Sequence, residues 1–235
     1  MWCGSRAWLA AALDPRYAPP MKIGIIGSGN VAQTLARGFV AQGHTVALGT
    51  REPAKLEAWQ KDQAPQVKLG STREVAAAAD VVLLAVKGTA ATAVVEQLGD
   101  AISGKPVMDA TNPIADVPPT HGILSYFTGP NESLMERLQA AAPAAHFVKA
   151  FSSVGAGLMV HPQLGTRPSM FICGNDAGAK QTVTTLLAEL GWDAEDVGMA
   201  VGARAIEPLC QLWCAPGLLR GDWAHAFKML RTPST

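Results

Sequence analysis

Two patterns of apolar residues alternate along the chain. Short runs of branched apolar residues, typical of strands buried on both faces, occupy 22–27, 45–49, 80–86, 106–110, 146–151, 169–174 and 192–197. Between them lie segments with helical spacing, at 30–42, 52–62, 72–79, 90–98, 132–142 and 176–190. This alternation predicts an α/β fold, in which helices cover both faces of a doubly wound, mainly parallel sheet.

The pattern changes after residue 201. Pro208 and Pro216 are expected to interrupt or kink a helix here. Large apolar side chains continue to the end of the chain, at Leu209, Leu212, Trp213, Leu218, Leu219, Trp223 and Phe227. Because such groups are costly to expose, we expect a domain at 21–201 and a short helical tail at 202–235 that packs on the domain or on a partner subunit.

Composition narrows the classes of function. Apolar residues make up 49% of the 235 residues and charged residues 16%, a balance that disordered chains do not have. The 19 basic and 19 acidic side chains cancel, which disfavours nucleic acid or an anionic membrane as the main partner. The mean hydropathy is +0.15, yet no apolar run reaches the ~18 residues of a membrane span.

Four cysteines, Cys3, Cys173, Cys210 and Cys214, are too few for a disulfide-stapled fold. They favour a reducing, cytoplasmic location. Cys210 and Cys214 share a helix face, so a two-ligand metal clamp is one interpretation. No matching Cys or His pair accompanies them, and we favour buried small hydrophobes and no metal site.

Residues 1–20 form a leader with a short apolar stretch behind Arg6. A charged Asp14-Pro15-Arg16 follows where a signal peptide would have a small-residue cleavage site. Met21 then opens a strong strand. We therefore expect a disordered or alternative-start extension, with a signal peptide as the less favoured interpretation.

The most specific local signal is the segment 27–32, which reads Gly-Ser-Gly-Asn-Val-Ala between a strand and a helix. In this G-x-G-x-x-A pattern Gly27 permits a tight turn, Gly29 admits a pyrophosphate, and Ala32 allows close packing of helix and strand. The helix N-terminus adds N–H groups and a partial positive charge. The pattern predicts a Rossmann-type dinucleotide site whose phosphates contact Gly27, Ser28, Gly29, Asn30 and Val31; a tight turn that binds nothing is the alternative.

The second strand indicates which cofactor binds. NAD-binding sheets usually end this strand in an acidic residue that binds the ribose, whereas here Thr50 and Arg51 stand at the tip and Lys55 follows one turn later. A hydroxyl and cationic groups suit a 2′-phosphate. We predict NADP(H) rather than NAD(H), although Arg51 at a helix start is also compatible with a solvated side chain.

Further strand ends should face the same crevice. Ala85 and Val86 end one strand, and they allow close approach of the nicotinamide. Asn112 and Ser153 follow two others and offer neutral hydrogen-bonding groups. For Asn112 a plain turn is an equally good interpretation.

From Met21 to Arg231 the chain resembles the NADPH-dependent oxidoreductases named for coenzyme F420, and its dinucleotide module is similar to the cytosolic domain of the STEAP metalloreductases. The resemblance rests on five segments: MKIGIIGSGNVA at 21–32, Gly-Thr-Arg at 49–51, Val-Lys-Ala-Phe at 148–151, Gly-Asn-Asp-Ala at 174–177, and Ala-Arg followed by Ile-Glu-Pro-Leu at 203–209. The third and fifth segments distinguish this family from other enzymes with the same glycine turn.

The resemblance implies hydride transfer between NADP(H) and a flavin-like acceptor, with coenzyme F420, FAD or FMN as the second substrate and a homodimer as the assembly. It also implies acceptor-side roles for Lys149, Phe151 and Ser153, although Lys149 is equally compatible with a solvated strand edge. The family often reads Lys-Ala-Phe-Asn-Thr where this chain has Ser152 and Ser153. None of the five histidines stands in a catalytic context.

Two other functions fit the same turn. One is a non-catalytic NADP(H)-binding sensor, because the fold does not fix the function. The other is a dehydrogenase or imine reductase with another small substrate. Such enzymes usually add a long helical domain, whereas only about 60 residues follow Gly174 here.

Overall fold

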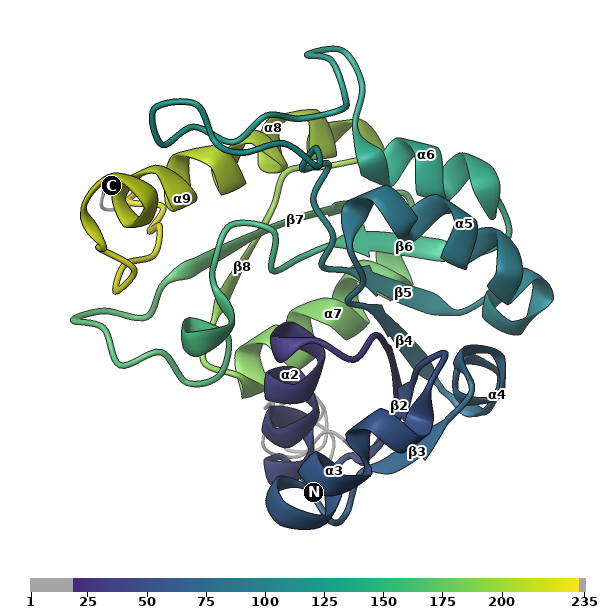
Figure 1. The fold of residues 1–235 in the computed structure, drawn as a ribbon. Helices are drawn as coiled ribbons and strands as arrows, with labels where there is room; N and C mark the ends of the chain where they lie inside the picture. The colour runs from purple at the N-terminus through teal and green to yellow at the C-terminus, as the bar shows by residue number, and fades with distance from the viewer. Residues whose placement is uncertain (1–18, 233–235) are drawn as a thin grey trace, which may run out of the picture.

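The computed structural model describes residues 19–232, which form one eight-stranded sheet with the strand order β3-β2-β1-β4-β5-β6-β7-β8 (Figure 1). The strands are β1 Lys22–Ile26, β2 Thr45–Gly49, β3 Lys68–Gly70, β4 Val81–Leu84, β5 Pro106–Asp109, β6 His146–Lys149, β7 Ser169–Gly174 and β8 Asp193–Asp196. β1 to β6 are parallel to one another, and β7 pairs with β6 antiparallel. The expected α/β, Rossmann-type fold with a mainly parallel sheet is confirmed.

Helices cover both faces of this sheet. They are α2 Asn30–Ala41, α3 Glu57–Gln63, α4 Thr72–Ala78, α5 Gly88–Leu98, α6 Leu134–Ala141 and α7 Ala177–Glu189, with short 3-10 turns at Pro53–Leu56, Gly99–Ile102, Ala156–Leu158 and Ala200–Gly202. One apolar core contains side chains of α2 and α7, and the other contains side chains of α4, α5 and α6. Consecutive residues of β1 show why strands between two helical layers are apolar throughout: Ile25 belongs to the first core and Ile26 to the second.

Two helices follow β8, namely α8 Ala203–Ile206 and α9 Pro208–Arg220. Pro208 stands in the first turn of α9, where a missing N–H breaks no hydrogen bond. The interruption expected at Pro216 is wrong, because α9 continues through it until Gly221 adopts a left-handed conformation with φ 74°. Burial of Cys210, Trp213 and Gly217 holds the helix against the domain despite the lost backbone hydrogen bond.

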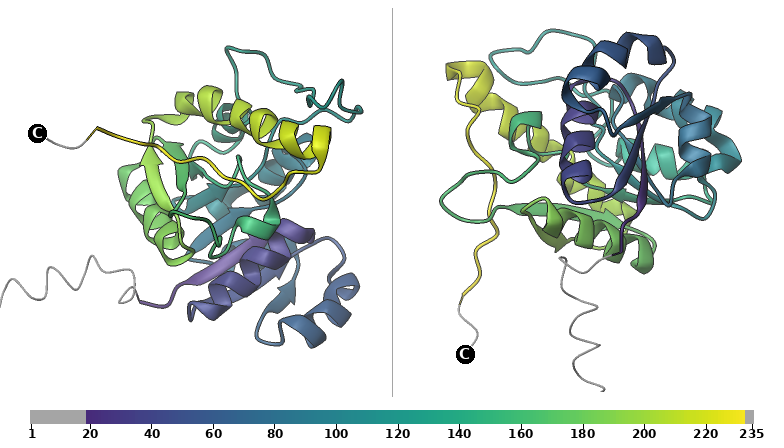
Figure 2. Two further views of the ribbon diagram at one scale, coloured as in Figure 1. Left: turned by 90° about the vertical axis from the view of Figure 1, so that its left-hand side faces the viewer. Right: turned by 90° about the horizontal axis from the view of Figure 1, so that it is seen from below.

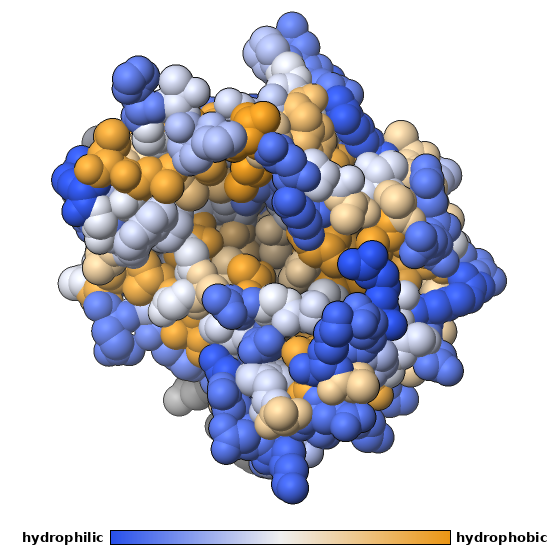
Figure 3. Space-filling view, viewed as in Figure 1, coloured by the Kyte–Doolittle hydropathy of each residue, from blue (hydrophilic) through white to orange (hydrophobic). Residues whose placement is uncertain are grey.

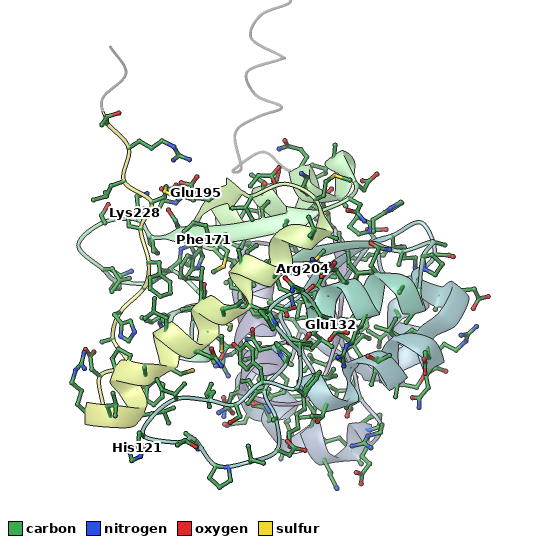
Figure 4. The ribbon with its side chains drawn as sticks, turned by 90° about the horizontal axis from the view of Figure 1, so that it is seen from above. His121, Glu132, Phe171, Glu195, Arg204 and Lys228 are labelled. Carbon is green, nitrogen blue, oxygen red and sulfur yellow. The ribbon has the colours of Figure 1, made fainter. Side chains whose placement is uncertain are left out.

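After α9 the chain returns to the β7–β8 part of its own sheet (Figure 2). The N–H of Ser169 donates to the carbonyl of Phe227 over 2.9 Å, and the ammonium of Lys228 lies 2.6 Å from Asp193. Figure 4 shows Lys228 and Glu195 together at this edge. These contacts attach the tail to its own domain.

The expectations for Cys3 and for nearly all of the leader fall outside the described residues. Among residues 19–232, no helix is both long enough and apolar enough to cross a membrane.

Candidate dinucleotide site

A cleft of about 370 Å³ lies at the carboxyl ends of β1, β2 and β4, where the strand order reverses. This is the switch point at which doubly wound sheets bind their ligands. The cleft is lined by Ile26, Gly27, Ser28, Gly29, Gly49, Thr50, Arg51, Thr72, Ala85, Val86, Lys87, Ala90, Ala93, Val94 and Gln97. Seven of the residues expected at the cofactor are among them: Gly27, Ser28, Gly29, Thr50, Arg51, Ala85 and Val86.

The two glycines of the turn have different surroundings. Gly27 has φ 144°, and a Cβ there would stand 2.2 Å from the carbonyl oxygen of Ala85. A Cβ on Gly29 would meet no atom within 4 Å. Gly27 is therefore required by the fold itself, while Gly29 leaves open the space that a pyrophosphate needs.

Helix α2 begins at this turn with Gly29 as its N-cap, and no side chain caps it. Its first turn contains no acidic residue. The N–H groups of the first turn have no partner within the helix, and the helix dipole favours an anion beside them. The turn and the helix start are therefore suited to bind an anion.

Thr50 and Arg51 flank the cleft as expected, whereas Lys55 does not line it. The ammonium of Lys55 lies 2.8 Å from the carboxylate of Glu52, and this hydrogen bond lowers the pKa of Glu52. Arg51 has no ion-pair partner within residues 19–232. The guanidinium of Arg51 is thus the available cation at the tip of β2.

The residues of α5 that line the cleft were not among those predicted. Ala90, Ala93, Val94 and Gln97 follow one another at helical spacing on α5 and line the cleft together. The signal was present in the sequence, because α5 follows β4 at the switch point and its small residues recur on one face.

The tips of β5 and β6 lie beyond this cleft, and so do two residues at the start of α2. Asn112, Ser153, Asn30 and Val31 do not line it. The side-chain amide of Asn112 donates to the backbone carbonyl of Ser152 over 2.9 Å, which joins the two tips.

Comparison with known proteins identifies the family. Residues 22–113 match the family described as NADP oxidoreductase, coenzyme F420-dependent. A crystal structure from Arthrobacter sp. FB24, of a protein named as an F420-dependent NADP reductase, is 34% identical in sequence, with 90% of this chain and 100% of that chain covered and a TM-score of 0.83. The chain belongs to this family.

Two other relatives are informative. Metalloreductase STEAP3 of Rattus norvegicus is 32% identical over 210 residues, or 87% of this chain, and the chain spans 40% of that relative's length. A reductive aminase from Aspergillus terreus in complex with NADPH is 22% identical, with 86% of this chain and 64% of that chain covered and a TM-score of 0.61. At this identity the aminase shows a shared fold.

The acceptor-side candidates of this chain, Lys149, Phe151 and Ser153, are all buried. Lys149 is 0% exposed, and its ammonium lies 2.6 Å from Asp109 and 2.8 Å from Glu207 and donates to the carbonyl of Thr111 over 2.9 Å. Burial lowers the pKa of Lys149, but the two carboxylates outweigh it and hold that pKa above its usual value. Lys149 contacts neither solvent nor the cleft. The interpretation of Lys149 as a solvated strand-edge residue is therefore wrong, while its acceptor-side role stays a prediction.

Phe151 and Ser153 follow at the tip of β6. Phe151 is buried in a left-handed conformation with φ 58°, which is uncommon for an aromatic residue. Its ring packs edge-on against Trp192 at 6.4 Å between centroids. Ser153 is 4% exposed. Both residues are therefore buried parts of the tip of β6.

A second hollow of about 330 Å³ opens beside this tip and is lined by Gly155, Gly157, Leu158, Trp213 and Trp223. The two indole rings stand 5.5 Å apart at 45°. Figure 3 shows the face of the molecule hollowed near its middle, with apolar residues lining the depression. Trp213 packs directly on Gly155, and both indole rings line the hollow.

The cysteines show no disulfide among the described residues. Cys173, Cys210 and Cys214 are free thiols, and the sulfurs of Cys210 and Cys214 are 4.0 Å apart. Burial raises the pKa of Cys173 to about 12, whereas a hydrogen bond with Cys210 lowers the pKa of Cys214. Within residues 19–232 no group of three or more His, Cys, Asp and Glu side chains is placed to hold a metal ion.

Proposed function

We propose that this protein is an NADPH-dependent reductase that transfers a hydride between the nicotinamide and a flavin-like acceptor, namely coenzyme F420, FAD or FMN. One observation carries the choice of cofactor: the phosphate turn and Arg51 line the same cleft, and a threonine stands where NAD-binding sheets have an acidic residue. Arg51 and Thr50 would hold the 2′-phosphate, while the N–H groups at the start of α2 would hold the pyrophosphate.

The second hollow supports a flat acceptor. When bound, the reduced nicotinamide supplies a hydride from C4. Transfer to a planar ring system requires parallel stacking and exclusion of water more than an acid–base pair. The walls formed by Trp213 and Trp223 suit an aromatic ring. His44 fits the same conclusion, because it is buried, pairs with Glu189 and lines neither hollow.

The deciding experiment follows NADPH oxidation by the purified protein with F420, FAD and FMN as acceptors. We expect turnover with at least one of them. Binding of NADPH without turnover of any acceptor would favour the alternative of a non-catalytic sensor. Turnover only with imines or hydroxy acids would instead favour a dehydrogenase or imine reductase with another small substrate.

We also propose a homodimer and a cytoplasmic location. The three described cysteines are free thiols, which fits a reducing compartment. Several apolar side chains of α9 stay exposed, Leu212 and Leu219 at 59% each, which fits a covering subunit. An NADPH-dependent reaction with a diffusible acceptor calls for no nucleic-acid or membrane partner.

A further inference from the structure

The two sequence segments that distinguish this family meet in the interior. Lys149 belongs to the segment at 148–151, and Glu207 belongs to the segment at 203–209. Their side chains are 0% and 2% exposed and form a 2.8 Å ion pair. Asp109, opposite Lys149 in the strand register, completes the cluster at 2.6 Å. One ammonium thus meets two carboxylates away from water.

Stability alone is a weak explanation for such a cluster. Removing charges from water costs several kcal/mol per ion, and buried ion pairs can often be replaced by apolar side chains without loss. The cluster also holds particular backbone and side-chain atoms in place.

The cluster fixes the first residues after β5. The ammonium of Lys149 donates to the carbonyl of Thr111 over 2.9 Å, while Asp109 accepts from the N–H and the hydroxyl of Thr111 at 2.9 and 2.6 Å. All three polar groups of Thr111 are therefore bound. Asn112 comes next, and its amide is bonded to the carbonyl of Ser152 beyond β6. The tips of β5 and β6 are thus held as one unit.

The same cluster attaches the C-terminal helices to these tips. Glu207 stands between α8 and α9, and its carboxylate accepts from the N–H groups of Leu134 and Met135 at 2.9 and 3.0 Å. Its backbone carbonyl accepts from the hydroxyl of Tyr126 over 2.7 Å. The helix that carries Trp213 is therefore placed relative to β5 and β6 by Glu207.

A dinucleotide whose pyrophosphate lies on the 27–29 turn extends its nicotinamide half along the carboxyl edge of the sheet, from β1 and β4 toward β5. We propose that Lys149, Asp109 and Glu207 are positioning residues that hold the tips of β5 and β6 against the nicotinamide half of the cofactor. This inference rests on the proposed function. It assigns no contact with substrate to the three side chains.

The test compares two ligands by direct binding titration. NADPH contains the nicotinamide, and 2′-phospho-ADP-ribose lacks it but keeps every group bound in the cleft. We expect Lys149→Met to leave the Kd of 2′-phospho-ADP-ribose unchanged and to weaken NADPH by roughly 2- to 12-fold, the loss of about one hydrogen bond. Glu207→Gln preserves the side-chain shape and should act in the same direction, so it decides the matter if Lys149→Met does not fold.

Glu189→Gln is the matched control. It neutralises the carboxylate of another buried pair, the 2.7 Å contact of Glu189 with His44. His44 directly precedes β2 and so lies at the amino ends of the strands, away from the dinucleotide cleft. A merely structural role predicts that the control and the Lys149 variant change both ligands alike. An unchanged ratio of the two dissociation constants in the folded variants would overturn the inference and leave the proposed function intact. Wild-type protein that binds neither ligand would overturn both.

Discussion

At the scale of single residues, the two turn glycines separate folding from binding. A side chain on Gly29 points into open space, so Gly29→Val should fold normally and place its methyl groups where a pyrophosphate must lie. We expect unchanged thermal unfolding and loss of NADPH binding in a fluorescence titration. Gly27→Ala is the contrasting variant, because its Cβ would clash with the Ala85 carbonyl and should lower the melting temperature. Full NADPH binding by folded Gly29→Val would contradict the position of the site.

Arg51 provides the test of cofactor choice. Without a protein partner for its charge among the described residues, the guanidinium is available for the 2′-phosphate. Arg51→Ala should therefore weaken NADPH by ~1.5–3 kcal/mol while leaving NADH nearly unchanged. Lys55→Ala is the control, since Lys55 pairs with Glu52 and does not line the cleft. Titration of both variants with both cofactors measures the preference, and an undiminished preference in Arg51→Ala would show that another group binds the phosphate.

The sequence could predict residues whose role depends on local chain order. The turn at 27–32 and the tip at Thr50 and Arg51 follow directly from strand, turn and helix in succession. Lys149 illustrates what local order cannot show. Its partners Asp109 and Glu207 are far away in the sequence, and its burial results from how β5, β6 and the C-terminal helices pack together.

At the scale of elements, the apolar pattern located the central strands well because they are buried on both faces. The two edge strands differ. The three residues of β3, Lys68–Gly70, contain a single large apolar side chain and escaped prediction, and β8, Asp193–Asp196, is acidic and partly exposed. The interruption predicted at Pro216 was wrong because it considered local preference alone. Local preference disfavours proline inside a helix, but packing of Trp213 and Cys210 against the domain outweighs that preference in α9.

Trp213 is the largest buried side chain of the C-terminal tail. It is 6% exposed, its indole N–H donates to the carbonyl of His225 over 2.8 Å, and it packs directly on Gly155. We expect Trp213→Ala to reduce the free energy of unfolding by ~3–5 kcal/mol, the usual range for a buried aromatic residue, as measured by denaturant titration. Trp223→Ala, at a position that is 44% exposed, should cost clearly less. Equal losses in the two variants would mean that the tail is not attached through Trp213.

At the scale of the whole molecule, charged pairs fasten one side of the C-terminal region. Arg204 of α8 binds the carboxylate of Glu136 in α6 through two hydrogen bonds of 2.9 and 2.7 Å, and Figure 4 shows Arg204 close to Glu132. Arg231 pairs with Glu195 of β8 at 2.5 Å. On α9 itself Leu212 and Leu219 stay 59% exposed, although Leu219 lies against Gly122. These leucines are an apolar part of the C-terminal region that the described chain leaves largely open.

We expect a dimer because these leucines of α9 are exposed. Leu212 and Leu219 are seven residues apart on α9, share one helix face and are 59% exposed each, with Leu218 at 40% beside them. A two-fold partner would bury this face and supply the cover over the acceptor that one chain lacks, and symmetric dimers are the commonest oligomers. Light scattering at micromolar concentration should therefore give twice the 24.5 kDa mass of the chain.

The double variant Leu212→Glu and Leu219→Glu should be monomeric, with impaired acceptor turnover and normal NADPH binding. Leu230→Glu is the control: Leu230 is 82% exposed near the end of the tail, and this variant should stay dimeric. A wild-type monomer with full activity would show that one chain alone builds the acceptor pocket.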